Sequence, residues 1–119
     1  NVVVGLANSN SHVGAMISVY RLVGESDTLY SSNSDTASSL NLNLNTLSGG
    51  AAIACAATQN GSALSWSGVT SDVSADVNTN EFFGAASLYP SSTNTPLSVS
   101  PSASGTFARA GVSISLQPA

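Results

Sequence analysis

An apolar run that ends in a turn dipeptide is the feature that most constrains the fold. The run Ala51–Gln59 (AAIACAATQ) is apolar on both faces of an extended chain. Such a pattern is typical of a strand buried between two layers. Asn60-Gly61 follows and suits a two-residue type I′ turn, and the alternation resumes at Leu64 and Trp66. We therefore predict a central β-hairpin.

Alternation with a period of two predicts strands on both sides of this hairpin. In Leu40–Leu44 leucine alternates with asparagine, so one face is expected to be core and the other solvated. In Phe107–Leu116 we expect Val112, Ile114 and Leu116 to point inward and Ser113, Ser115 and Gln117 outward. Further strands are predicted at Asn1–Ala7, Ala15–Val23 (central), Val73–Val77 (edge), Glu81–Leu88, and between Pro96 and Pro101.

These segments give about eight strands, joined by turns rich in Gly, Asn, Ser and Pro, and no convincing helix. The pattern predicts a two-layer antiparallel β-sandwich with jelly-roll-like wiring, and an immunoglobulin-like Greek key is the alternative. Gly24–Ser39 is polar and carries three acids, which indicates a long surface loop and the first place to look for function.

Charged residues make up 7% of the 119 positions, whereas Ser, Thr and Asn supply 44 of them. The length predicts a single domain over residues 1–119. The fixed cations are Arg21 and Arg109, and the net charge is -4. Nucleic acids and anionic membranes are bound largely through lysine and arginine, so this composition argues against both partners. Arg21 lies in an otherwise apolar segment, which favours a structural ion pair.

The sequence offers no recognisable catalytic or cofactor site. Cys55 is the single cysteine, which rules out an intramolecular disulfide and favours a small buried hydrophobe over a reactive thiol. His12 has no acid near it and no nucleophile motif to join, so we predict no enzymatic activity. The acids fit no calcium-loop spacing, and we predict no metal and no cofactor; the sets considered are Asp72, Asp76 and Glu81, and Glu25, Asp27 and Asp35.

Aromatic residues supply the candidate binding positions. Tyr30 and Tyr89 lie in or beside polar segments and are the aromatics expected to be most exposed, as contact anchors for a partner. Trp66 suits a stacking platform for a sugar, but it shares a face with Leu64, and core packing is the favoured interpretation.

Several segments together resemble a known kind of domain. They are ISVYRLVG (residues 17–24), GGAAIACAA (49–57), LSWSGVTSD (64–72), FFGAAS (82–87) and FARAGVSISLQPA (107–119). This order resembles a β-sandwich domain of uncharacterised proteins of tailed bacteriophages and prophages, over nearly the whole chain from Met16 onward. In that group a tryptophan-glycine-leucine/valine-threonine element recurs with an acid soon after, here Trp66, Gly68, Val69, Thr70 and Asp72. The resemblance implies a virion setting and one or two further strands ahead of Asn1, and it carries over no catalytic residues.

We therefore expect a non-enzymatic structural protein on the exterior of a bacteriophage particle, as a capsid decoration or a tail- or fibre-associated module. Its expected partners are other virion proteins and further copies of itself, because a surface poor in long charged side chains loses less entropy on association. The alternatives are a glycan-binding adhesion module and a subunit of an extracellular filament that exchanges an N-terminal strand with its neighbour.

Overall fold

The computed structural model describes residues 18–21, 29–37, 39–59, 63–77, 81–103 and 109–118. These residues form nine β-strands and no helix, which confirms the predicted all-β fold. The strands are β1 (Leu29–Ala37), β2 (Leu44–Thr46), β3 (Ala51–Gln59), β4 (Ser65–Ser67), β5 (Thr70–Asp76), β6 (Glu81–Leu88), β7 (Asn94–Leu97), β8 (Ser100–Ser102) and β9 (Arg109–Leu116).

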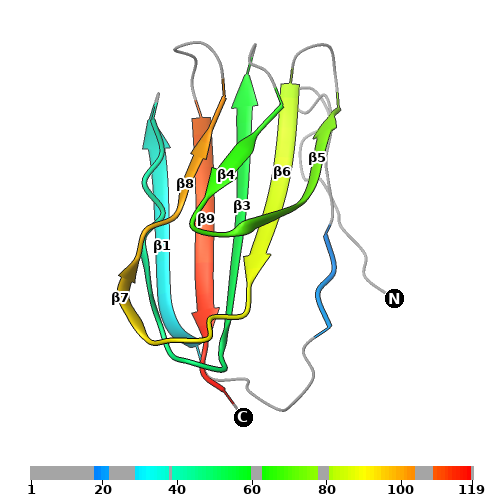
Figure 1. Ribbon diagram of the computed structural model, residues 1–119. Coiled ribbons are helices and arrows are strands. Elements are labelled where there is room, and N and C mark those ends of the chain that lie inside the picture. Colours follow the sequence, from blue (N-terminus) through cyan, green and yellow to red (C-terminus); the bar gives the residue numbers. More distant parts are fainter. Residues whose placement is uncertain are drawn as a thin grey trace.

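Five strands form one antiparallel sheet in the order β1-β9-β3-β6-β5, and the others pair as β2–β7 and β4–β8. Figure 1 shows β4, β7 and β8 crossing in front of this sheet. We call the face of the sheet that points toward these short strands the inner face, and the opposite face the outer face.

The chain passes back and forth between the sheet and the short pairs. β1, β3, β6 and β9 belong to the sheet, whereas β2, β4 and the β7–β8 segment, which lie between them in sequence, belong to the short pairs. Neighbours within the sheet are therefore mostly distant in sequence. β5 and β6 are consecutive strands that do pair, at the edge of the sheet.

The central hairpin predicted from Ala51 to Trp66 is wrong. β3 is central, but it pairs with β6 on one side and β9 on the other, so no edge remains for β4. β4 instead pairs with β8, with Trp66 opposite Pro101. An apolar strand gains most when both of its edges are paired, and an Asn-Gly signal does not specify whether the next strand returns to the same sheet. Residues 60–62 lie outside the described part of the chain.

The core lies between the inner face and the leucines of residues 40–44. Leu40, Leu42 and Leu44 are all buried, as the alternation with asparagine predicts. They pack on the small residues of the sheet: Leu40 contacts Ala56, and Leu42 contacts Ala54. Small residues on the sheet leave room for large ones above it, so the two sets interdigitate.

Gly111 shows how closely this core is packed. A Cβ atom added at Gly111 would lie 2.8 Å from Leu42 Cδ1 and 3.2 Å from both Leu40 Cδ1 and the Cys55 carbonyl oxygen. Glycine is therefore required at this point of β9 by the leucines that cover it.

The predicted orientation of β9 is also wrong. Ser113 and Ser115 are 2% and 0% exposed, whereas Val112 and Ile114 are 55% and 38% exposed. The serines thus point to the inner face and the larger apolar residues to the outer face. The strand is present, but its two faces are exchanged relative to the sequence-based expectation.

Hydrogen bonding explains why serines occupy the inner face of β9. The segment 40–43 crosses that face without regular strand pairing, so some of its carbonyl groups need donors from side chains. Ser113 Oγ donates to the Leu42 carbonyl at 3.0 Å, and Ser115 Oγ donates to the Asn45 carbonyl at 2.5 Å. A valine at either position would leave a carbonyl in the interior without these bonds.

The predicted surface loop Gly24–Ser39 contains β1, which is an edge strand of the sheet. Its inward side chains bond the backbone of residues 41–45: Ser31 Oγ accepts from Asn45 N–H, and Asp35 accepts from Asn41 N–H. Asn33 Nδ2 donates to the carbonyls of Asn41 and Asn43. Every second residue of β1 therefore points inward, as in any strand. These inward residues are polar and contribute hydrogen bonds to residues 41–45 where other strands contribute apolar packing.

The remaining strand predictions have mixed outcomes. Glu81–Leu88 coincides with β6, which lies inside the sheet, and Val73–Val77 falls on β5, an edge strand as predicted. Pro96 and Pro101 do not bound one strand, because Pro96 lies within β7 after a cis peptide bond and Pro101 within β8. Ser18–Arg21 has no regular structure and so departs from the predicted central strand. Asn1–Ala7 lies outside the described residues.

Candidate functional site

The outer face combines apolar side chains with exposure. Its central members come from four strands, and the strand register places them in rows across the sheet. Ile53 lies opposite Ile114, and Cys55 lies between Val112 and Ala85. The set comprises Ile53, Cys55 and Ala57 of β3, Val73 of β5, Phe83 and Ala85 of β6, and Ala110, Val112 and Ile114 of β9.

A groove of about 360 Å³ crosses the outer face. Its described lining comes from β1, β9, β3 and β6, with Ser18 beside them, and includes Ser34, Thr36, Cys55, Ala57, Phe83 and Val112. An adjoining groove of about 290 Å³ shares part of this lining and reaches Glu81 and Arg109. The surface is thus shallow, apolar in the middle and bordered by hydroxyl groups on β1.

A hydrogen-bonded contact closes the β5 side of the outer face. Tyr20 Oη donates to Asp72 Oδ2 at 2.8 Å, and Ser87 Oγ donates to Asp72 Oδ1 at 3.1 Å. Asp72 is placed for both bonds by a register shift in β5 between Ser71 and Val73. The nearby Ala85 is buried although it belongs to the outer face. The face is therefore covered toward β5 and open over β9.

Two titratable groups on this face are held in their neutral forms. Burial raises the pKa of Tyr20, and the hydrogen bond to the Asp72 carboxylate raises this pKa further. Burial also raises the pKa of the Cys55 thiol, with a smaller contribution from the charge of Asp72. A thiol held in its protonated form is a poor nucleophile. Cys55 is only partly buried and lines the groove on the outer face, so the prediction that it is a small buried residue is wrong.

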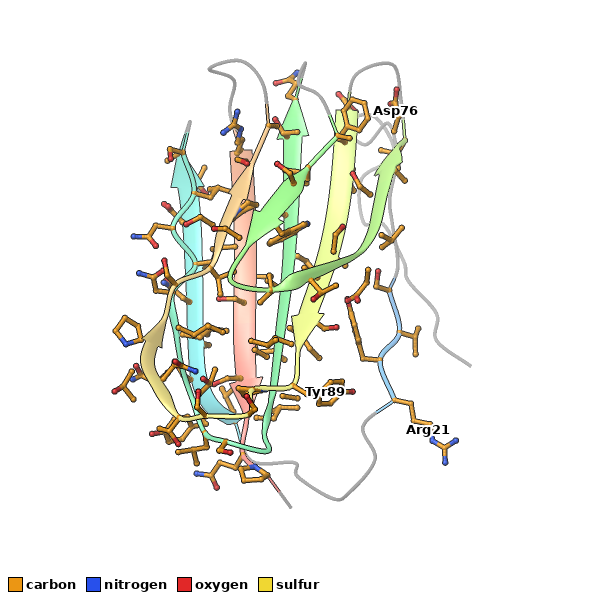
Figure 2. All side chains as sticks on the ribbon, viewed as in Figure 1. Arg21, Asp76 and Tyr89 are labelled. Carbon is orange, nitrogen blue, oxygen red and sulfur yellow. The ribbon has the colours of Figure 1, made fainter. Side chains whose placement is uncertain are left out.

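Both tyrosines proposed as contact anchors are exposed, Tyr89 to 66% and Tyr30 to 37%. The structure does not bring them together. Tyr30 lies on β1 and Tyr89 directly after β6, and β9 and β3 separate these strands. Three strand spacings amount to roughly 14 Å. Figure 2 shows Tyr89 near one end of the sheet and Asp76, the last residue of β5, near the opposite end.

Trp66 packs in the interior, as favoured from the sequence. It contacts both groups of buried residues, the one around Leu40 and Leu64 and the one around Leu42 and Val99. Its indole Nε1 is buried and has no hydrogen-bond partner among the described residues. Trp66 is therefore a packing residue whose side chain is only partly buried.

The acids considered for calcium are dispersed or already engaged. Asp72 bonds Tyr20 and Ser87, and Asp35 accepts from the N–H groups of Thr36 and Asn41. Within the described ranges, no group of three or more His, Cys, Asp or Glu side chains is arranged to hold a metal ion. Three residues considered from the sequence lie outside those ranges, namely His12, Glu25 and Asp27.

Arg21 is exposed and forms no ion pair with another described residue, so the structural ion pair expected for it is not seen in this part of the chain. Figure 2 shows its side chain projecting away from the sheet. The described residues also contain no helix long and apolar enough to cross a membrane.

Comparison of the chain with protein-family models, with curated proteins and with solved structures gave no match.

The outer face as a site was missed by the sequence analysis. Val112 and Ile114 are the most distinctive residues of this surface, and the sequence-based prediction placed both of them in the core. The available signal was Gly111, which shares a face with Ser113 and Ser115. A glycine and two serines in alternation mark the face that must fit beneath bulky residues, here the leucines of residues 40–44.

Proposed function

We propose that this chain is a non-enzymatic structural protein on the exterior of a bacteriophage particle, as a capsid decoration or a tail- or fibre-associated module. The observation that supports a structural role is the open, apolar, nearly uncharged outer face. Apolar surface left in contact with water favours association, and such patches on otherwise polar proteins mark interaction surfaces. The virion setting rests on the resemblance of residues 17–24, 49–57, 64–72, 82–87 and 107–119 to phage domains.

The composition supports contacts made by packing and hydrogen bonds. With two cations and six acids in 119 residues, the chain offers little for long-range attraction. Attachment should therefore hold when sodium chloride is raised from about 0.05 to 1 M, over which the Debye length falls from roughly 14 to 3 Å. Excluded salts such as sulfate should preserve or tighten the contact.

The proposal is tested by quantitative mass spectrometry of purified particles from the source of this sequence. The chain should sediment with the particles across the salt series, in a fixed ratio to the major capsid protein. A ratio of many copies per particle would place it on the head, and a few copies would place it on the tail. Absence from purified particles would refute the virion role.

A glycan-binding adhesion module is the second candidate, supported by the exposure of Tyr89 and Tyr30. Exposed tyrosines present apolar rings with a polar end, which suits contact with sugars. A glycan array with the full chain would test it, with Tyr89→Ala and Tyr30→Ala as variants. Reproducible binding lost in either variant would favour this function over a purely structural one.

A further inference from the structure

We propose that the outer face is a self-association surface, through which two copies of this chain stack face to face about a two-fold axis. The inference deepens the proposed structural role, on which it rests, by naming a surface and a partner. It is carried by the exposure, charge and size of the outer face.

Exposure is concentrated on β9 and its neighbours. Val112 and Ile114 are exposed on β9, and Val73 is exposed on β5. Leu29 is exposed too, and its pairing with Leu116 places it on the same side as Ile114. Val112 and Ile114 lie directly beside the partly buried Cys55 and Ile53 of the central strand. The exposed apolar residues over β9 and β3 therefore form one surface, and the buried Ala85 of β6 separates this surface from Val73.

Charge on this face suits a second copy better than a charged partner. The β1 residues that flank Val112 and Ile114 on the outer side are Ser34 and Ser32, which pair with them in register. Asp72 is engaged by Tyr20 and Ser87 at the β5 side. In a two-fold dimer the neutral apolar strands of one copy would face the same strands of the other copy, with hydroxyl groups at the border. No two like charges would then face each other at the centre of the interface.

The size of the face predicts a weak dimer. Four strands about 4.8 Å apart and a β9 length of about 27 Å give roughly 500 Å² in projection. A stable complex buries about 800 Å² on each partner, and smaller interfaces form transient complexes. Weak pairwise contacts become strong when many copies are held on one particle, because the second contact is then intramolecular.

The covered side of the face limits how the copies can meet. The Tyr20–Asp72 contact lies over β5, whereas the groove runs from β1 to β6 beside it. A partner sheet can therefore lie over β9 and β3 but not over Asp72. The two-fold axis would pass near Cys55 and Val112, which are paired at the middle of the open region.

The test is sedimentation velocity of the full chain from about 1 to 300 µM, a range that brackets micromolar affinities. The wild type should shift from monomer to dimer, and Val112→Asp should remain monomeric, with an affinity at least tenfold weaker. Val112 is 55% exposed, so aspartate can be solvated in the monomer and the fold should be kept. Circular dichroism and thermal unfolding of each variant would verify this.

Val19→Asp is the matched control. Val19 is an exposed valine at 73%, but it lies in the segment 18–21 and not on the sheet. The same substitution there should leave the dimer unchanged. A second variant, Val112→Thr, keeps the shape of the side chain while reducing its apolar character, and should weaken the dimer by a smaller factor.

A wild type that stays monomeric up to about 300 µM would overturn the proposal. If that monomer were markedly destabilised by Val112→Asp, the face would be covered by another segment of the same chain, such as residues 1–17, and not by a second copy. Dimers abolished equally by Val19→Asp and Val112→Asp would also overturn it. None of these outcomes depends on whether the chain is found in phage particles, which the mass spectrometry decides separately.

Discussion

The two faces of β9 run along the same eight residues and obey opposite rules. On the inner face the strand presents Gly111, Ser113 and Ser115, all buried, and on the outer face it presents Val112 and Ile114, both exposed. The inner residues are small because the leucines of residues 40–44 lie on them. Ser113 and Ser115 are polar because their hydroxyl groups bond the carbonyls of Leu42 and Asn45. In this protein, whether a strand residue is buried depends on which segment packs over it. The more hydrophobic face of a strand is therefore not always the face that points to the core.

The largest contrast is expected between Leu42 and Ile114. Leu42→Ala should cost about 2 to 5 kcal/mol of unfolding free energy, because it leaves a cavity under a fully buried leucine. Ile114→Ala should cost less than about 1 kcal/mol in the monomer, since Ile114 is already partly in water. Urea titrations of dilute protein would measure both. Equal losses would mean that Ile114 is buried and that the faces are assigned wrongly.

Gly111 and Ala110 offer the next test on adjacent positions. Gly111→Ala should cost about 1 to 3 kcal/mol, because the new methyl group meets Leu42 Cδ1 at 2.8 Å and the Cys55 carbonyl oxygen at 3.2 Å. Ala110→Val adds volume on the open outer face and should change stability by about 0.5 kcal/mol or less. Thermal unfolding of the two variants would show the difference. A tolerated Gly111→Ala would contradict close packing of the leucines on β9.

A substitution at Ser113 tests whether hydrogen bonds to the segment 40–45 stabilise the inner face of β9. Ser113→Ala should cost about 1 to 3 kcal/mol, because the buried Leu42 carbonyl loses the hydroxyl that bonds it at 3.0 Å. The control is Ser32→Ala, an exposed serine on the outer side of β1, which should stay within about 0.5 kcal/mol of wild type. Chemical denaturation would decide, and a neutral Ser113→Ala would show that the Leu42 carbonyl has another donor.

The smallest effect is expected where the outer face is covered. The pKa of Tyr20 is raised in the folded protein, so its neutral phenol is the stabilising form. That contribution should be complete below the pKa of an unfolded tyrosine, about 10, and should decline as the pH rises above it. Tyr20→Phe should remove the extra decline and lower neutral-pH stability by up to about 1 kcal/mol. Unfolding curves at neutral and alkaline pH would test this, and identical alkaline profiles would contradict the Tyr20–Asp72 bond.

Periodicity predicted burial well where a segment has one clearly apolar face. Leu40, Leu42 and Leu44 are buried as expected, although residues 40–43 are not in a strand and β2 begins only at Leu44. The predicted strand Glu81–Leu88 coincides with β6. Periodicity failed at β1, because Ser31, Asn33 and Asp35 alternate as hydrogen-bonding groups that no hydrophobicity pattern reveals.

Pairing and orientation were harder to predict than strand existence. The hairpin was wrong because a turn dipeptide reports local geometry, whereas the partners of β3 are set by β6 and β9, which lie far away in sequence. The faces of β9 were exchanged because Val112 and Ile114 were expected to be buried for their size. The need of the Leu42 carbonyl for a donor depends on a contact between residues 71 positions apart.

Radical footprinting of the full chain at low and high concentration tests the central claim most directly, namely that the outer face is open in the monomer and occupied on association. Side-chain oxidation, read residue by residue with mass spectrometry, should label Val112, Ile114 and Val19 in dilute protein. At high concentration Val112 and Ile114 should become protected while Val19 is labelled as before. Labelling of Val112 and Ile114 that does not change with concentration, or protection of Val19 in their place, would contradict the assignment of this face.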